Sequence, residues 1–355
     1  MKKSIFTLAL SILFCTSIWA KVRTVSQDAS TPAQYTTIPA AITASVAGDT
    51  IYVNGSATQY PTFTVSKVNL TFIGAGYSPT KDNPASTVLN YVYLDTTGNN
   101  QTGRGTKLIG FNIYGVMVGS NWGGAVIAKN QNVVISRCYL NYIDVSGDGW
   151  VIKNTVINSW LNFENHTNVV ASNNIFNTSY IQNISSPSVT IANNLFYKGG
   201  NVFYSGITQC IITNNIFLGT AIIATASVNS NSENYNLTYG IFGISGSGET
   251  LPTPLTTNTG GNNLNATDPM FNFETVVSLT SGTTFSLAWD FTLQGGSPAL
   301  TGGSGGVEIG LYGGTYPWVD NTGMAAIPYV QHMNITGVVP AAGNINVDVK
   351  AKRHN

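Results

Sequence analysis

The fold is decided by five stretches between residues 133 and 217 that can be written under one another. They read Val133-Val-Ile-Ser-Arg-Cys-Tyr-Leu140, Trp150-Val-Ile-Lys-Asn-Thr-Val-Ile157, Val169-Val-Ala-Ser-Asn-Asn-Ile-Phe176, Val189-Thr-Ile-Ala-Asn-Asn-Leu-Phe196 and Cys210-Ile-Ile-Thr-Asn-Asn-Ile-Phe217. Their first residues are separated by 17, 19, 20 and 21 positions. A unit of this length is too short to fold alone, so it must stack on copies of itself to bury its apolar side.

Within each stretch, apolar and polar residues alternate as they do in β-strands, and no helical period is present. A leucine-rich repeat has a similar length, but it needs several leucines at fixed positions and usually a helical segment. Short β-branched strands separated by Asn, Gly and Ser are typical of a β-helix instead. We therefore predict an all-β fold, a single-stranded right-handed parallel β-helix solenoid in which each stretch forms part of one coil.

Paired asparagines recur at one place in the repeat. They are Asn173-Asn174, Asn193-Asn194 and Asn214-Asn215, and Asn154 begins the column one coil earlier. Asparagine tolerates the left-handed backbone of a sharp corner. If one member of each pair points inward, its amide can form hydrogen bonds with the equivalent amides of the coils above and below. We expect a structural role for all of these residues.

The two ends of the solenoid need covering, and the sequence offers one element for each. Ile38 to Val46 is rich in alanine, with apolar residues at helical spacing, and predicts a short capping helix. Tyr329 to Gly337 and Ile345 to Lys352 predict a C-terminal β-hairpin, since the second of them alternates strictly. A lone hairpin is marginal in water, so we expect it to cap the last coil rather than to attach the protein to a partner.

The first residues are typical of an export signal. Lys2 and Lys3 precede a short apolar run, and Ala20 marks a plausible cleavage point. A membrane anchor is the alternative, but no stop-transfer charges follow the run. Acylation of Cys15 would make a lipoprotein, but Phe14 before it is a poor fit to the small residue that such sites need.

Composition and charge narrow the class of protein further. Charged residues make up only 8%, against about 25% in ordinary soluble proteins. The formal net charge is +0 and no basic patch is visible, which argues against nucleic acid as a partner. Beyond residue 20 no apolar run approaches the roughly 20 residues that cross a bilayer.

We predict a signal peptide over residues 1–20, a β-helix over 21–322 and a hairpin extension over 323–355. The protein would be extracytoplasmic, secreted or at the cell surface, without a transmembrane span in the mature chain.

Two sets of motifs stand near the two ends of the predicted solenoid. The first is Gly48-Asp-Thr-Ile-Tyr-Val53 followed by Leu70-Thr-Phe-Ile-Gly74. The second comprises Asp268-Pro-Met-Phe271, Asp290-Phe-Thr-Leu293, Ser297-Pro-Ala299 and Glu308-Ile-Gly-Leu-Tyr-Gly313. The first set resembles the start, and the second the last coils, of pectin-lyase-like right-handed parallel β-helix proteins, in particular secreted bacterial ones. The resemblance implies the fold over most of residues 36–315. It leaves activity open, because the superfamily includes polysaccharide lyases, glycoside hydrolases and adhesins.

The catalytic patterns of the enzymes in this superfamily are missing from the sequence. A lyase needs a base and cations that stabilise an enolate, and a glycoside hydrolase needs two carboxylates that face one bond. Asp144, Asp148, Glu164 and His166 fall on adjacent coils and are weak catalytic candidates. They could hold calcium or form an acid/base pair, or they could be solvated turn residues. No zinc spacing or calcium loop of the EF-hand type is present, so we predict no metal site and no other cofactor.

Aromatic residues recur in the second strand of three neighbouring coils. Tyr142, Trp160 and Tyr180 align there, and strand alternation sends them outward. Asp144, Asn162 and Gln182 follow on the same face. We expect an aromatic column beside a polar column, which suits a sugar chain: rings stack on the sugars and polar groups bind their hydroxyls. The alternative is that the aromatic rings only pack against one another.

The sequence favours an exported β-helix protein that binds carbohydrate or acts as a cell-surface structural module. Its partner would be a polysaccharide or another surface component. The alternative is a polysaccharide lyase or glycoside hydrolase that acts on an acidic polysaccharide.

Cys138 and Cys210 lie four coils apart in the alignment, too far for a disulfide, so we predict that both remain thiols.

Overall fold

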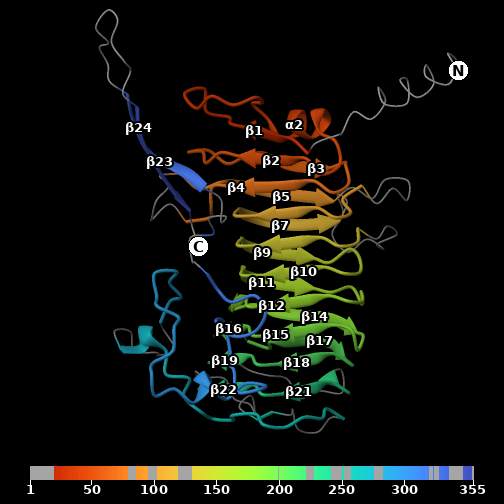
Figure 1. Ribbon diagram of the computed structural model, residues 1–355. Coiled ribbons are helices and arrows are strands. Elements are labelled where there is room, and N and C mark those ends of the chain that lie inside the picture. Colours follow the sequence, from red (N-terminus) through yellow and green to blue (C-terminus); the bar gives the residue numbers. More distant parts are fainter. Residues whose placement is uncertain are drawn as a thin grey trace, which may run out of the picture.

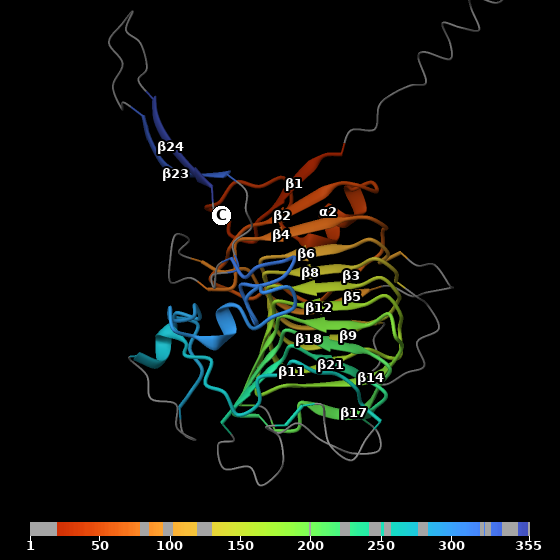
Figure 2. The same cartoon turned by 60° about the horizontal axis from the view of Figure 1, so that its bottom comes forward.

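The computed structural model describes residues 20–78, 85–94, 102–118, 130–198, 200–220, 228–240, 250–251, 257–275, 283–319, 323, 328–335 and 347–353. Its main body is the predicted right-handed parallel β-helix, whose coils stack from β1 (Val22–Val25) at one end to β21 (Ser232–Asn234) and β22 (Leu237–Tyr239) at the other (Figures 1 and 2). The expected signal peptide and Cys15 lie outside the described residues, apart from Ala20. Within those residues, no helix is long and apolar enough to cross a membrane.

Two parallel sheets form the walls of the solenoid. The first consists of β1 (Val22–Val25), β2 (Thr50–Val53), β4 (Thr71–Gly74), β6 (Lys107–Ile109), β8 (Val134–Ser136), β10 (Val151–Lys153), β12 (Val170–Ser172), β15 (Thr190–Ala192), β18 (Ile211–Thr213) and β21 (Ser232–Asn234). The second consists of β3 (Phe63–Val65), β5 (Val88–Leu94), β7 (Asn112–Val118), β9 (Tyr139–Asp144), β11 (Val156–Asn162), β13 (Ile175–Asn177), β14 (Tyr180–Ser185), β16 (Leu195–Tyr197), β17 (Phe203–Thr208), β19 (Ile216–Leu218), β20 (Val228–Asn229) and β22 (Leu237–Tyr239).

The register of the first sheet is that of the sequence alignment. Ile135, Ile152, Ala171, Ile191 and Ile212 pair in order along the axis, and all five side chains are buried. The inward position after each asparagine pair is aromatic, so that three phenylalanine rings stack along the core of the solenoid. The repeat period and the strand parity predicted from the sequence are therefore confirmed.

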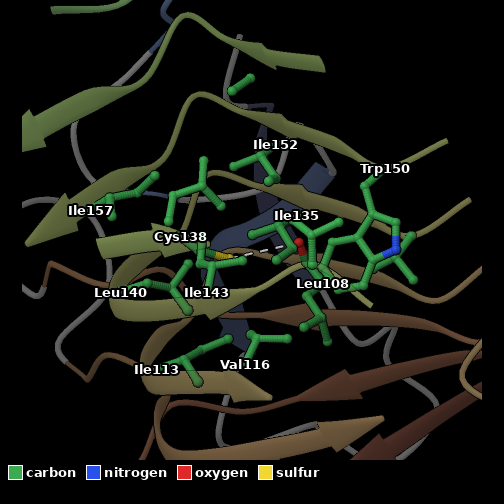
Figure 3. Close-up of a cluster of buried hydrophobic side chains, with 14 of the residues drawn as sticks. Leu108, Ile113, Val116, Ile135, Cys138, Leu140, Ile143, Trp150, Ile152 and Ile157 are labelled. Atoms are coloured by element: carbon green, nitrogen blue, oxygen red, sulfur yellow. Dashed lines mark hydrogen bonds between the residues drawn. The ribbon is translucent and has the colours of Figure 1, made fainter. Parts of the chain in front are cut away.

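The core inside the solenoid is continuous and apolar. Figure 3 shows Leu108, Ile135 and Ile152 from successive coils around Trp150, with the sulfur of Cys138 among them. Cys138 and Cys210 are both buried and unbridged, as predicted.

The two members of each asparagine pair have different roles, the first at a corner of the coil and the second in a ladder of amides. The first members, Asn173, Asn193 and Asn214, have φ angles of 55°, 56° and 55°, in the left-handed region. The second members point inward, and the Asn174 Nδ2 group donates to Asn194 Oδ1 at 3.1 Å. The same bond recurs from Asn194 to Asn215, from Asn215 to Asn236 and from Asn236 to Asn263. The predicted amide ladder is present and extends two coils further than the sequence analysis placed it.

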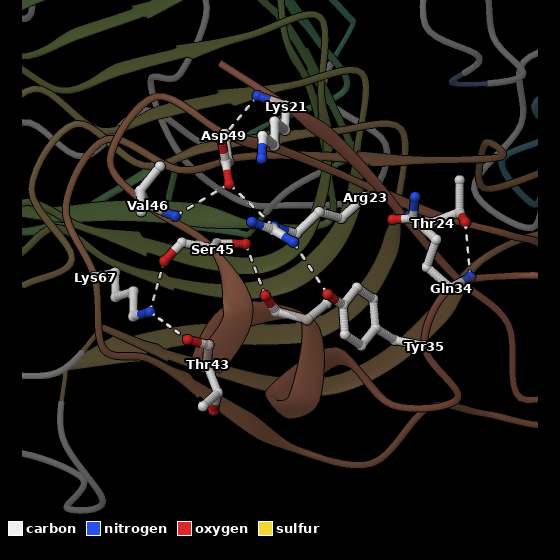
Figure 4. Close-up of polar contacts among 11 residues, drawn as sticks. Lys21, Arg23, Thr24, Gln34, Tyr35, Thr43, Ser45, Val46, Asp49 and Lys67 are labelled. Atoms are coloured by element: carbon white, nitrogen blue, oxygen red, sulfur yellow. Dashed lines mark hydrogen bonds and ion pairs between the residues drawn. The ribbon is translucent and has the colours of Figure 1, made fainter. Parts of the chain in front are cut away.

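The N-terminal end carries the predicted capping helix. Helix α2 (Ile38–Ala44) begins at Thr37, whose side chain accepts a hydrogen bond from the Ala40 N–H, and it buries its apolar face. Behind it, the buried Asp49 carboxylate accepts from the Lys21 N–H, the Val46 N–H and the Arg23 guanidinium (Figure 4). These bonds tie the helix and β1 to the start of β2.

Residues 268–318, which were expected to form the last coils, contribute no strand to either sheet in the described part of the chain. The described ones, residues 268–275 and 283–318, run instead along the outer surface of the second sheet, beside β16, β19 and β22, and include the short helices η2 (Asn272–Thr275) and η3 (Pro298–Leu300) (Figure 1). We call residues 268–275 and 283–318 the strap. The strap and the sheet enclose a second apolar core, to which the strap contributes Phe271, Phe273, Phe291, Ala299, Ile309, Leu311 and Trp318.

The corner asparagines hold the strap to the solenoid. Asn173 Nδ2 donates to the carbonyl groups of Leu311 and Gly313, at 2.8 and 2.7 Å, and Asn154 Nδ2 donates to that of Tyr316. Gly314 has a φ of +71°, and a Cβ atom there would lie 2.4 Å from the amide oxygen of Asn193, so only glycine fits. The outward asparagines thus have a docking role that the repeat alone did not reveal.

The predicted C-terminal hairpin is present as β23 (Pro328–Ile335) and β24 (Val347–Arg353), which pair antiparallel. It does not cap the last coil. In both views it lies near the end of the solenoid that carries β1 and α2, and it points away from the coils (Figures 1 and 2). The strap, which returns the chain along the outside of the solenoid, accounts for this position.

Candidate functional site

The outer face of the second sheet is divided lengthwise into two halves. One half lies next to the asparagine corners, where the chain enters the second sheet. It carries Val156, Ile175, Leu195 and Ile216, which are buried beneath the strap. The other half, formed by the ends of β9 and β11 and by β14 and β17, lies beyond the strap. This second half carries the aromatic residues predicted from the sequence.

Tyr142, Trp160 and Tyr180 occupy neighbouring positions in three coils, as predicted. Trp160 pairs in register with Tyr142 on one side and with Tyr180 on the other. The ring centroids of Tyr142 and Trp160 lie 5.3 Å apart at an interplanar angle of 50°. All three side chains are half-buried.

The column is longer than the three aligned residues indicate. Tyr114 lies 5.3 Å from Tyr142, Tyr91 lies 5.0 Å from Tyr114, and Tyr204 lies 4.7 Å from Tyr180, measured between ring centroids. We call these six residues, Tyr91, Tyr114, Tyr142, Trp160, Tyr180 and Tyr204, the aromatic ridge. Tyr114 is 42% exposed and Tyr204 is 55% exposed. The ridge therefore runs along the solenoid axis and presents large apolar surface to solvent.

The predicted polar column lies beside the ridge, with Asn162 at its centre. Asn162 pairs in register with Asp144 on one side and with Gln182 on the other. Its amide nitrogen donates to Asp144 Oδ1 at 3.1 Å and also to Glu164 Oε1. Its amide oxygen accepts from Asn183 Nδ2 at 2.9 Å. The structure thus joins two carboxyl groups, Asp144 and Glu164, through a single buried amide.

The electrostatics of this carboxyl pair differ from those of a solvated turn. Burial raises the pKa of Asp144 to about 6, the hydrogen bond from Asn162 opposes the rise, and the nearby charge of Glu164 adds to it. Asp144 consequently changes its charge near neutral pH. A carboxyl group with this property can act as a general acid or as a pH-dependent hydrogen-bond acceptor.

Asp148 and His166, the other two weak catalytic candidates, form a separate contact. His166 Nδ1 lies 3.6 Å from Asp148 Oδ1, and the Thr167 N–H donates to the same carboxylate. Asp148 follows β9 by four residues, in the turn toward β10, so that this contact belongs to the corner rather than to the ridge face. The structure therefore pairs Asp144 with Glu164 and Asp148 with His166.

The four candidate ligands for calcium form two separate pairs, Asp144 with Glu164 and Asp148 with His166. No group of three or more His, Cys, Asp or Glu side chains that could hold an ion occurs among the described residues. The Asn162 oxygen, which a calcium ion could use, already accepts from Asn183 and from the Glu164 N–H. The calcium site suggested by the sequence stays a hypothesis.

No protein-family model and no curated protein matches this chain. Among solved structures it is similar to a pectin methylesterase from Aspergillus niger, with 16% identity, a TM-score of 0.27, and coverage of 69% of this chain and 87% of the other. It is also similar to QnrB1, a plasmid-mediated fluoroquinolone resistance protein, with 11% identity, a TM-score of 0.16, and coverage of 57% of this chain and 91% of the other. Both likenesses concern the fold alone.

Proposed function

We propose that this chain binds carbohydrate along the aromatic ridge and serves as an exported binding or surface structural module. Tyrosine and tryptophan offer an apolar face on which a sugar ring can stack, and a polar tip that can form hydrogen bonds. Strands in neighbouring coils lie about 4.8 Å apart, so the ridge places one aromatic ring in each of six successive coils, where a linear chain could run along them. The polar column beside it supplies acceptors and donors for hydroxyl groups.

The observation that carries the proposal is the contrast between the two halves of one sheet face. The apolar residues of one half are covered by the strap, in a well-packed second core. The other half concentrates six aromatic side chains, two of them more than 40% exposed, where no part of the strap covers them. Exposed apolar surface of this kind, rimmed by polar residues, typically marks a binding site.

An exported location fits this proposal, because an exported protein meets the polysaccharides of cell walls and cell surfaces. Its support is the sequence of residues 1–20, with its basic start and short apolar run.

A second candidate function is catalysis at the carboxyl pair, by a polysaccharide lyase or a glycoside hydrolase. The observation in its favour is the raised pKa of Asp144 beside the carboxyl group of Glu164, since a carboxyl group with a raised pKa can act as a general acid beside a second carboxyl group. An assay for reducing ends and for ultraviolet-absorbing unsaturated uronates tests it. Turnover by the wild type that is lost in Asp144→Asn would establish catalysis.

Affinity electrophoresis against a panel of polysaccharides tests the binding function. We expect the wild type to be retarded by at least one polysaccharide and Trp160→Ala to migrate as it does in an empty gel, because central aromatic residues contribute most to binding. Trp160→Phe keeps a ring at the position and should retain part of the retardation. Thermal melts of the three proteins separate binding from folding.

Two outcomes would contradict the proposal. One is a wild type that no polysaccharide retards. The other is equal retardation of Trp160→Ala and the wild type, which would mean that the rings only pack against one another.

A further inference from the structure

The strands that carry the aromatic ridge have an uneven balance of charge. In β5, β7, β9, β11, β14 and β17 the only charged residue is Asp144, and none of them contains Lys or Arg. Glu164 follows β11 by two residues and joins Asp144 through the Asn162 amide. The ridge is therefore flanked by two carboxyl groups, and its own strands offer no cation to offset them.

The carboxyl pair also keeps free acceptors. Asn162 Nδ2 occupies one oxygen of each carboxyl group, Asp144 Oδ1 and Glu164 Oε1. The second oxygens, Asp144 Oδ2 and Glu164 Oε2, receive no hydrogen bond from any residue that the structure describes. An ionised carboxylate only accepts hydrogen bonds, so these two oxygens suit ligand groups that donate.

We infer that the ridge selects glycans that present hydroxyl or ammonium donors and carry no carboxylates, and that it excludes polyuronates. The inference rests on the proposed function and specifies its substrate class. Donors from neutral sugars or from amino sugars would meet the free oxygens, whereas a uronate stacked on the ridge would bring a third negative charge to the pair. The acidic polysaccharide suggested by the sequence analysis is thereby the disfavoured ligand.

Coulomb's law gives the expected difference in binding between glycans without carboxylates and polyuronates. Two like charges about 4 Å apart in water repel enough to weaken binding about five- to tenfold, and more where the surface is partly shielded from solvent. Added salt screens this repulsion, so the discrimination should shrink as ionic strength rises.

Retention on three bead-bound polysaccharides tests the inference: barley β-glucan (neutral), glycol chitosan (an amino sugar chain) and polygalacturonate (anionic), at pH 7 and low salt. We expect at least fivefold stronger retention on β-glucan or on glycol chitosan than on polygalacturonate. The stronger of the first two identifies hydroxyl or ammonium groups as the preferred donors.

The variant Asp144→Asn/Glu164→Gln removes both charges while keeping the shape of the side chains. Its retention on polygalacturonate, relative to the other two polysaccharides, should rise about five- to tenfold above that of the wild type. Asp28→Asn removes an exposed charge that is more than 100 residues from Asp144 in the sequence. This control should leave the retention on polygalacturonate, relative to the other two polysaccharides, unchanged. Circular dichroism and thermal melts confirm that each variant is folded.

The experiment distinguishes failure of this inference from failure of the proposed function. A wild type that prefers polygalacturonate, with binding lost in Trp160→Ala, overturns this inference and leaves the proposed function standing. An unchanged ratio in the double variant also overturns it. Absence of retention on every polysaccharide overturns both.

Discussion

The inward asparagines show how a single residue type can hold one coil to the next. Asn194 Nδ2 donates to the Ala171 carbonyl and to Asn215 Oδ1, and Asn194 Oδ1 accepts from the backbone and side-chain N–H groups of Asn174. The side chain is fully buried, so no water replaces a lost partner. Each ladder residue therefore satisfies groups in two neighbouring coils at once.

Replacing Asn194 with Leu should destabilise the protein by about 2–5 kcal/mol, because it removes the acceptor of the buried Asn174 N–H and the side-chain bonds to Ala171 and Asn215. Asn177→Leu is the matched control: Asn177 is half-buried on the outer face and makes one side-chain bond, to Asn158. Chemical denaturation of both variants measures the difference. Equal unfolding midpoints would argue against the ladder.

For the asparagine ladder and the aromatic ridge, the sequence predicts which residue types form the column better than it predicts how many coils the column spans. The pairs around Asn174, Asn194 and Asn215 were visible because their spacing is regular. Asn263 was missed because the coil before it is 27 residues long and the alignment stopped earlier. Tyr91 and Tyr204 were missed for the same reason, since loops of unequal length separate them from the aligned repeats.

Among the elements, the N-terminal cap depends on a buried ionic group. Burial alone would raise the pKa of Asp49, but hydrogen bonds from Lys21, Val46 and Arg23, with the Arg23 charge, outweigh it and lower the pKa below 3.8. A carboxyl group whose pKa is lowered by folding contributes stability above its unfolded pKa. That contribution is lost as the pH falls through the folded value.

We therefore expect Asp49→Asn to lower stability at pH 7 by about 1–3 kcal/mol, because a charged acceptor is replaced by a neutral one. The gap between variant and wild type should narrow below about pH 4, where the wild type loses the same contribution. Thermal melts between pH 7 and pH 2.5 measure both effects. A gap that stays constant over this range would contradict the assigned role of the charge.

The strap is the element for which the sequence predicts the wrong structure. Its motifs resemble the final coils of other β-helix proteins and therefore predict coils. The signal for a covering layer lay elsewhere, in Ile175-Phe176, Leu195-Phe196 and Ile216-Phe217, where adjacent residues are both apolar. A strand that is apolar on both faces is buried on both faces. A segment outside the solenoid was therefore required.

If the strap seals a second core, Ile309→Ala should destabilise the whole protein by about 2–5 kcal/mol, since Ile309 is fully buried. Val307→Ala, two residues away in the same segment, removes a side chain that is 42% exposed and should change stability by no more than about 0.5 kcal/mol. Urea denaturation of both variants provides the comparison. Similar small effects would indicate that the strap is only loosely attached.

For the whole molecule, the stacked coils form one continuous core that shields both cysteines. Burial raises the pKa of Cys138 to about 12 and that of Cys210 further still, so neither thiol is reactive in the folded protein. Peptide mass spectrometry after alkylation should find both cysteines unmodified in the native protein and both modified after unfolding. Alkylation of either one under native conditions would show that the solenoid opens locally.

Fold and function differed in how far the sequence could predict them. The solenoid follows from a period near 20 residues, because stacking is the only way for such units to bury their apolar side. The binding face needed the structure, since the ridge is defined by which half of the sheet the strap leaves uncovered. That division depends on contacts between residues more than 100 positions apart, such as Asn173 with Leu311.

The most direct test of the binding face is a crystal structure of the chain soaked with an oligosaccharide of whichever polysaccharide retards it. We predict sugar rings stacked along Tyr142, Trp160 and Tyr180, with hydroxyl or amino groups on the free oxygens of Asp144 and Glu164. Sugar density on the first sheet or at the hairpin, with the ridge unoccupied, would contradict the account.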